Sequence, residues 1–200
     1  MVSSDPLARL VDQIRACTAC ESDWSHSARP IIQVDAKASI LIAGQAPGSA
    51  VHASGIPFDD PSGERLRDWM GIDRDTFYNP RHVAIVPMAF CYPGRGKTGD
   101  LAPPKRCADK WREALLDKLG NIQLTLLIGQ YAQHWHLPAS KNQSLTDTVR
   151  QWRSQPNGIM PLPHPSPRNN IWLAKNPWFT ADVLPTLQSR VQFALSSNRR

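Results

Sequence analysis

Short apolar runs bounded by turn-forming residues dominate the pattern of hydrophobic and polar positions along this chain. Runs of this length are typical of β-strands, since helices in globular proteins usually extend over ten or more residues. Three of the four runs are almost wholly apolar, as expected for parallel strands that are covered by helices on both faces. The predicted strands are residues 39–43, 83–87, 124–128 and 158–162.

Stretches with apolar residues at helical spacing separate these runs. Asp5 is suited to cap the first helix, with Pro6 at its first position. Ser62 is expected to cap a second helix, and Gly71 to end it. Strands that alternate with helices predict a parallel α/β sheet, whose site lies in the loops after the carboxyl ends of the strands. The helices are expected over 6–16, 62–71, 105–119 and 179–195, with shorter ones starting near 130 and 144.

The composition fits a soluble globular protein that forms one domain over 1–200. With 200 residues, 41% of them hydrophobic and 20% charged, the chain can bury a core without disulfides. No apolar run approaches the roughly 20 residues that cross a bilayer, and the N-terminus lacks the apolar segment of a signal peptide. We therefore expect a cytoplasmic protein without membrane contact. The net charge of +6 is a weak indication of a polyanionic partner.

The loop after the first predicted strand contains the first candidate chemistry. Two glycines on either side of a proline make a rigid turn that can bring backbone N–H groups close to a ligand. An ordinary tight turn between a strand and a helix explains the same residues without any chemistry. The residues of this turn are Gly44, Gln45, Ala46, Pro47 and Gly48.

A second candidate loop, 163–170, follows the last predicted strand. His164 lies between two prolines, which restrict its backbone and fix the direction of its imidazole. Ser166 can donate a hydrogen bond to a phosphate, and Arg168 can pair with a phosphate or project into a duplex. The alternative is a proline-rich surface loop that happens to contain a histidine.

The cysteines form one close pair and two distant single residues. In a cytosolic chain they indicate metal binding, catalysis or plain burial rather than disulfides. Thiolates favour zinc or an iron–sulfur cluster, and the spacing does not match a zinc ribbon with two close pairs. Four buried free thiols are the third reading. The residues are Cys17, Cys20, Cys91 and Cys107.

Together these motifs resemble the uracil-DNA glycosylase superfamily, especially its family 4 in a bacterial branch described only as uracil-DNA glycosylase-like. Family 4 has a G-E-x-P-G turn, a P-F segment, an H-P-S loop and four cysteines that bind a [4Fe-4S] cluster. The C-x2-C and C-x15-C spacings of this chain agree with those cluster ligands. The corresponding stretches are 44–48, Pro57-Phe58, His164-Pro165-Ser166 and the four cysteines.

The resemblance implies a three-layer α/β/α fold around a four-stranded parallel sheet, and a DNA-repair enzyme that hydrolyses the N-glycosidic bond of a flipped-out base. His164 matches the donor to the leaving base, and Gln45 of the turn 44–48 is the other expected catalytic residue. Phe58 matches the ring that stacks on the base. Ser166 matches a serine that contacts phosphate, and Arg168 lies where the family inserts a side chain into the base stack.

The resemblance also implies a [4Fe-4S] cluster, with zinc as the alternative that thiolate chemistry leaves open. The cluster would tie the N-terminal segment 1–36 to the rest of a single domain. DNA is the expected partner, and we expect a monomer without an obligate protein partner.

This chain departs from the family at the positions that handle water and the base. Gln45 replaces the family 4 glutamate, and Ala46 stands where other families have a water-positioning Asp or Asn. Pro87 replaces an asparagine that reads the uracil edge, so another damaged base is an alternative substrate. The residues near enough in sequence to position water instead are Asp59, Asp60 and His52.

Two other functions are consistent with these departures. One is a DNA-binding or damage-sensing protein that has the glycosylase fold with little or no turnover. The other is a zinc-stabilised α/β protein with a different ligand.

Overall fold

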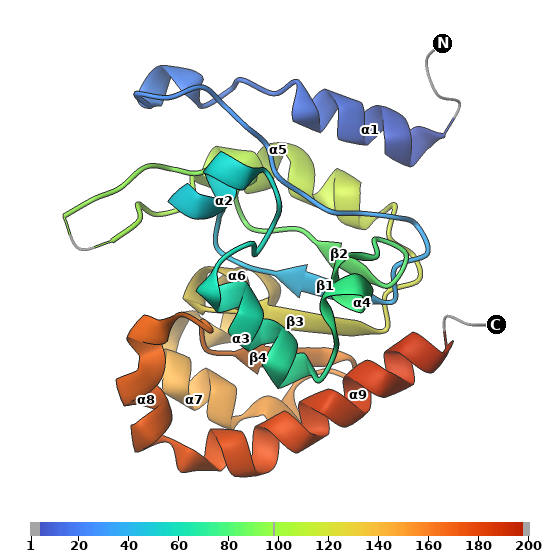
Figure 1. Ribbon diagram of the computed structural model, residues 1–200, viewed down its shortest axis with the longest axis vertical. Coiled ribbons are helices and arrows are strands. Elements are labelled where there is room, and N and C mark those ends of the chain that lie inside the picture. Colours follow the sequence, from blue (N-terminus) through green and yellow to red (C-terminus); the bar gives the residue numbers. More distant parts are fainter. Residues whose placement is uncertain (1–4, 98, 198–200) are drawn as a thin grey trace.

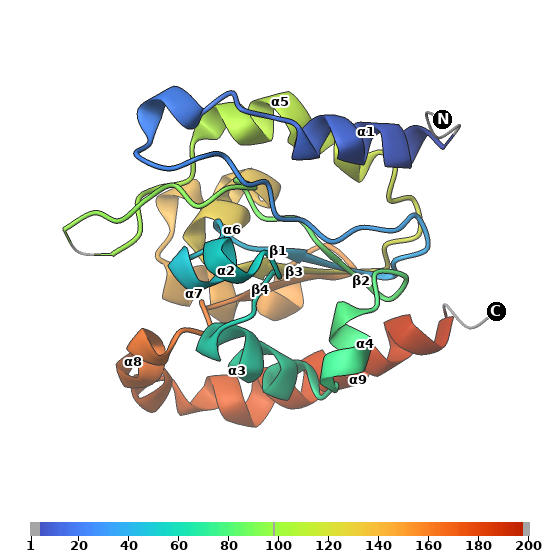
Figure 2. The same ribbon diagram turned by 45° about the horizontal axis from the view of Figure 1, so that its top comes forward.

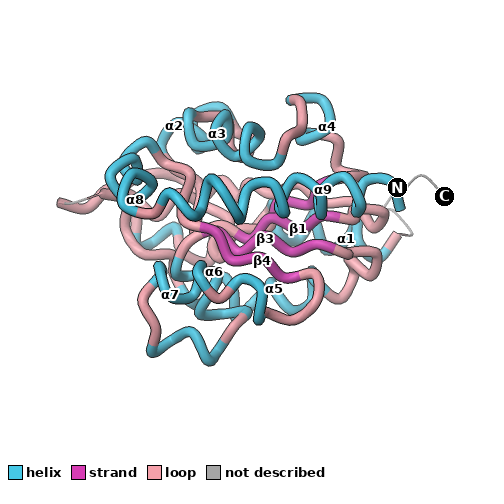
Figure 3. The backbone as a smooth tube through the Cα atoms, turned by 90° about the horizontal axis from the view of Figure 1, so that it is seen from below, coloured by secondary structure: helices cyan, strands magenta, loops and turns pink. Residues whose placement is uncertain are grey.

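All four predicted runs form strands in the computed structural model, which describes residues 5–97 and 99–197. The strands run parallel because each is joined to the next by a segment that contains helices. They lie side by side in the order β2-β1-β3-β4. Figure 3 shows β1, β3 and β4 next to one another. Their bounds are β1 (Ile40–Ala43), β2 (Val83–Ile85), β3 (Leu124–Ile128) and β4 (Ile159–Leu162).

The side chains of each strand alternate between two apolar faces of the sheet. Ile40 and Ile42 of β1 pack into one core, whereas Leu41 and Ala43 belong to clusters on the opposite face. Helices cover both faces, and Figure 2 shows the resulting three layers. The predicted three-layer α/β/α fold with a four-stranded parallel sheet is therefore confirmed.

The first helical layer contains α1 (Pro6–Arg15), α5 (Lys105–Leu116) and α6 (Gln130–His136). Figure 2 shows α1 and α5 lying together above the sheet. Asp5 caps α1 as predicted, because its Oδ1 accepts a hydrogen bond from the Leu7 backbone N–H at 3.0 Å. The apolar side of α1 faces α5 and the sheet through Leu7, Val11 and Ile14.

The opposite layer contains α3 (Pro61–Met70), α4 (Arg74–Tyr78), α7 (Leu145–Arg150) and α9 (Leu184–Ser197). Buried side chains from all four helices join Ile40 and Ile42 in the largest core cluster. The last helix begins with a π-helical turn, Phe179–Val183, that continues directly into α9. Among the described residues, no helix is both long and apolar enough to cross a membrane.

The carboxyl ends of the strands finish at one edge of the sheet. Figure 1 shows α2 (Ser49–Ser54), α8 (Asn170–Lys175) and the described parts, 92–97 and 99–104, of the long loop 92–104 at that edge. These segments follow β1, β4 and β2, respectively. The site predicted from strand order is therefore built from three segments that are far apart in the sequence.

The helix predictions need three corrections. Asp60, not Ser62, caps α3, and its carboxylate accepts a hydrogen bond from the Gly63 N–H at 2.8 Å. The helix expected to reach residue 119 ends at Leu116. The short helices α2, α4 and α8 were not predicted, because five or six residues are too few to show a helical period.

Candidate active site

A cleft lies at the carboxyl edge of the sheet, between the loop after β1, the loop 92–104 and the loop after β4. It encloses about 590 Å³, within the range of small-molecule sites, roughly 300–1,000 Å³. The structure thus brings together the residues that the sequence assigned to base and DNA contact. Lining residues include Gly44, Gln45, Ala46, Pro47, Gly48, Phe58, Asp60, Pro87, Asp100, His164, Ser166 and Arg168.

Phe58 forms part of the cleft wall in a strained backbone conformation. Its φ of 55° lies in the left-handed region that residues with side chains seldom adopt. Its carbonyl accepts a hydrogen bond from the Tyr78 hydroxyl at 3.2 Å, and its ring packs edge-to-face against Phe77. The tip of the ring lies 3.5 Å from the point where a Cβ on Gly44 would sit. The ring is therefore held against the first loop, and strain of this kind is typical of functional sites.

Hydrogen bonds around His164 determine which ring nitrogen carries the proton. Nδ1 accepts a hydrogen bond from the Ser166 backbone N–H at 3.2 Å, and the His164 carbonyl accepts one from the Asn169 side chain at 2.7 Å. A backbone N–H can only donate, so this network assigns the proton of the neutral ring to Nε2. The ring therefore retains one N–H donor for a ligand.

The surroundings of His164 keep its ring neutral. Burial lowers the pKa of His164 below its usual 6.5, although the carboxylates of Asp60 and Asp100 act in the opposite direction. A neutral imidazole can stabilise a developing anion by hydrogen bonding, without giving up its proton.

The turn after β1 is fixed to the neighbouring segments. The Gly44 carbonyl accepts from the Met88 N–H at 2.8 Å, and the Gln45 carbonyl accepts from the Ala89 N–H at 3.0 Å. The Gln45 side chain donates to the Leu101 carbonyl at 3.3 Å. This amide therefore contacts the loop 92–104 and brings no carboxylate into the cleft.

The three candidates for positioning water lie in different environments. Asp59 forms an ion pair with Arg74 at 3.0 Å and does not line the cleft. His52 also lies outside the lining and packs against the rings of His26 and Tyr92. Asp60 does line the cleft, but one of its oxygens caps α3.

Sequence reasoning missed Asp100, a second carboxylate that lines the cleft. Its Oδ2 lies 3.6 Å from the point where a Cβ on Gly48 would sit. The signal that could have found it is its place in a Pro/Gly-rich loop that follows a parallel strand.

Polar and basic groups from the loop after β4 border the same cleft. The Ser166 hydroxyl accepts from the Arg168 N–H at 3.2 Å, and the Ser166 carbonyl accepts from Arg65 at 3.1 Å. The Arg168 side chain is exposed and, like Arg95, lines the cleft. Exposed guanidinium groups beside a cleft suit contact with a phosphate backbone.

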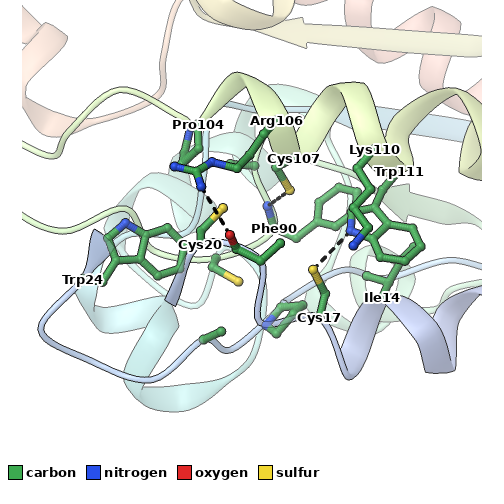
Figure 4. Close-up of a pocket in the computed structure, with 15 residues that line it drawn as sticks. Ile14, Cys17, Cys20, Trp24, Phe90, Pro104, Arg106, Cys107, Lys110 and Trp111 are labelled. Atoms are coloured by element: carbon green, nitrogen blue, oxygen red, sulfur yellow. Dashed lines mark hydrogen bonds between the residues drawn. The ribbon is translucent and has the colours of Figure 1, made fainter. Parts of the chain in front are cut away.

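All four cysteines line one small cavity between α1, α5 and the segment that follows β2. Figure 4 shows Cys17, Cys20 and Cys107 around this cavity, with Trp24 and Trp111 on its walls. The Trp111 indole N–H donates to the Cys17 sulfur at 3.3 Å, and the Phe90 N–H donates to the Cys107 sulfur at 3.4 Å. The C-x2-C pair and the two single cysteines therefore converge.

Burial controls the charge of the cysteines in this cavity. Burial raises the pKa of Cys91 to about 12 and that of Cys107 to about 11, so bare thiols there stay neutral. N–H groups directed at sulfur are typical of iron–sulfur sites. Among the described residues, no three His, Cys, Asp or Glu side chains come together as ligands of a single metal ion.

Arg112 of α5 connects the cysteine-bearing helix with the end of β2. It is fully buried, and its guanidinium donates to the carbonyls of Val86 and Pro87 at 2.8 and 2.9 Å. Nη2 contacts the His136 Nε2 at 2.8 Å. Burial lowers the pKa of Arg112 to about 10, which leaves it charged at neutral pH.

The family model of the uracil DNA glycosylase superfamily matches residues 31–188, well over half of this chain. The chain therefore belongs to the uracil DNA glycosylase superfamily, whose members act on DNA. The match includes every cleft residue described above. It also includes Cys91 and Cys107, whereas Cys17 and Cys20 precede the matched range.

Replacing Gly63 by alanine should displace Phe58. A Cβ at this position would lie 1.8 Å from the Phe58 carbonyl oxygen, so the strained segment must move. We expect Gly63→Ala to lower the free energy of unfolding by about 1–3 kcal/mol, as measured by urea denaturation. Gly120→Ala is the matched control, since nothing lies within 4 Å of its added Cβ. Equal stability of the two variants would contradict the proposed constraint.

Titration of His164 should show a midpoint below 6.5 with the proton of the neutral ring on Nε2, as measured by ¹⁵N-detected NMR. The unfolded chain takes up this proton near pH 6.5, whereas the folded chain does so only at lower pH. The contribution of His164 to stability is therefore present above pH 6.5 and declines as the pH falls below it. His164→Gln should show a shallower loss of stability over this window. A midpoint at or above 6.5 would contradict the assignment.

Proposed function

We propose that this protein is a DNA glycosylase that hydrolyses the N-glycosidic bond of uracil or a related damaged base. The observation that carries this proposal is the neutral His164, with its Nε2–H free to donate, in the same cleft as the strained Phe58 ring. An aromatic face can stack on an extruded base while a fixed donor contacts its carbonyl oxygen.

In this mechanism the C1′–N bond breaks and the sugar becomes oxocarbenium-like. The electron pair moves to the departing base, whose negative charge is shared with its carbonyl oxygen. His164 Nε2–H donates a hydrogen bond to that oxygen. This bond becomes stronger as negative charge develops on the oxygen, and so it lowers the barrier. Water then adds to C1′ and leaves an abasic site.

The residues after β2 influence which base the cleft can accept. Pro87 lines the cleft without a side-chain donor or acceptor, and its carbonyl is engaged by Arg112. The Gln45 amide is directed to Leu101. We therefore propose that this cleft selects among damaged bases mainly by its shape and by stacking on Phe58. Hydrogen bonds to the edge of the base would contribute less.

We propose that DNA binds across the cleft with Ser166 and Arg168 at its backbone. Both line the cleft, and the net charge of +6 favours association with a polyanion. Arg168 is exposed and long enough to enter the space that an extruded nucleotide leaves.

We propose further that Cys17, Cys20, Cys91 and Cys107 hold a [4Fe-4S] cluster, as in family 4. The apolar cavity and the N–H groups directed at sulfur support this assignment. A cluster binds each thiolate at a different iron and spreads them more widely than a single zinc ion does. Its role would be to join the segment 1–36 to α5 in one domain, without redox chemistry in base release.

A second candidate function is damage sensing without turnover. The loop after β1 has Gln45 bonded to a backbone carbonyl where a catalytic carboxylate would be expected. A protein of this kind would bind damaged DNA and release no base.

Base release from uracil-containing single- and double-stranded oligonucleotides tests the proposal directly. We expect release by the unmodified protein, and a roughly 10²–10³-fold slower single-turnover rate for His164→Ala, because one donor to the leaving group is lost. His134→Ala, outside the cleft, is the control and should keep the full rate. Release that survives the loss of His164 would refute its role, and tight binding without any release would favour damage sensing.

Substitution of Cys17 by serine tests the four-ligand assignment. We expect Cys17→Ser to reduce visible absorbance, iron and sulfide content and the denaturation midpoint together, because one ligand is lost. Thr18→Ser, an exposed neighbour, should change none of these. A Cys17→Ser protein that stays coloured and fully folded would contradict the assignment, and stoichiometric zinc in place of iron would favour the zinc alternative.

A further inference from the structure

The loop 92–104 brings a carboxylate to the cleft opposite the turn that lacks one. Its described parts, 92–97 and 99–104, lie beside each other as in a hairpin, and the Gly96 N–H donates to the Gly99 carbonyl at 2.7 Å. The Leu101 N–H donates to the Gly94 carbonyl at 2.9 Å. Asp100 lies on the returning side of this hairpin and lines the cleft.

Contacts from two cleft segments position the returning side of the hairpin. Gln45 donates to the Leu101 carbonyl at 3.3 Å, directly after Asp100. The Arg168 guanidinium lies 3.1 Å from the point where a Cβ on Gly99 would sit, directly before Asp100. The Asp100 Oδ2 itself lies close to Gly48. Leu101 is therefore bonded to Gln45, and Gly99 lies close to Arg168, so Asp100 is placed between two residues that line the cleft.

Asp100 differs from the other acidic groups in and near the cleft. Asp59 is paired with Arg74, and Asp60 uses an oxygen to cap α3. Among the described residues, the Asp100 carboxylate forms no ion pair and no hydrogen bond within the protein. Its charge nevertheless acts on His164, which places both groups in one electrostatic environment.

We propose that Asp100 is the catalytic carboxylate of this site, facing the sugar of the flipped nucleotide. This inference rests on the proposed glycosylase function. The C1′–N bond breaks and its electron pair leaves with the base. The carboxylate of Asp100 then stabilises the positive charge that develops on the sugar. It then accepts a proton from the water whose oxygen bonds to C1′. The products are the abasic site, the base anion held by His164, and a protonated Asp100, which returns its proton to the base or to solvent.

This assignment accounts for the amide at Gln45. A glutamate there would place a second negative charge beside Asp100, and its oxygens would face the Leu101 carbonyl without a proton to donate. Glutamine can donate to that carbonyl and so helps hold the loop that carries Asp100.

Binding of two abasic-site oligonucleotides tests the position of Asp100 without requiring turnover. One carries a pyrrolidine ring, protonated at neutral pH, in place of the sugar, and the other carries neutral tetrahydrofuran. We expect the unmodified protein to prefer the cationic ring by at least about tenfold, as one close charge pair allows. Asp100→Asn should lose this preference while its affinity for the tetrahydrofuran oligonucleotide stays within about twofold.

Asp117→Asn is the control, because it removes an equal charge at an exposed residue outside the cleft and should keep the preference. Equal binding of the two oligonucleotides by the unmodified protein, or a preference that survives Asp100→Asn, would overturn the proposal.

Single-turnover base release with the same variants separates this inference from the proposed function. We expect Asp100→Asn to slow release by about 10²–10⁴-fold, Asp100→Glu to recover part of the rate, and Asp117→Asn to leave it unchanged. An Asp100→Asn protein that releases base at the full rate would also overturn the proposal. Absence of release by the unmodified protein would refute the glycosylase function, and the binding preference would still decide whether Asp100 faces the sugar.

Discussion

Burial of the central sheet on both faces is the constraint on which the rest of this structure depends. Helices α1, α5 and α6 cover one face of the sheet, and α3, α7 and α9 cover the other. Side chains in the middle of a strand are therefore buried and cannot reach a ligand. Only their ends reach solvent, and in a parallel sheet all carboxyl ends reach it at the same edge. The Pro/Gly-rich segments that follow β1, β2 and β4 therefore meet there.

The cysteine cavity and the cleft are connected through the end of β2. Cys91 follows this strand closely, and Cys107 lies in the first turn of α5. Arg112, further along α5, holds the carbonyls of Val86 and Pro87, and Pro87 lines the cleft. A buried guanidinium that bonds to backbone carbonyls tolerates little movement, because each lost contact leaves a charge unsatisfied. Displacement of α5 would therefore move the part of the cleft wall that Pro87 forms.

The fold and part of the site could be predicted because their signals are local. Strands, the cap at Asp5 and the rigid loop around His164 follow from neighbouring residues. Asp59 and Asp60 are adjacent in sequence, yet one pairs with Arg74 and the other caps a helix, so sequence proximity could not assign a role to either. The Pro/Gly-rich loop that contains Asp100 indicates the edge of the sheet, but its place in the cleft depends on contacts with segments about fifty and seventy residues away.

The Ser166 backbone N–H donates a hydrogen bond to His164 Nδ1, so the tautomer of the ring does not depend on which side chain stands at position 166. Because the donor is a peptide group, every residue except proline at position 166 supplies it. The side chain at this position can therefore change while the proton of the neutral imidazole stays on Nε2. The tautomer of the ring is therefore set by the path of the chain and not by the side chain at position 166.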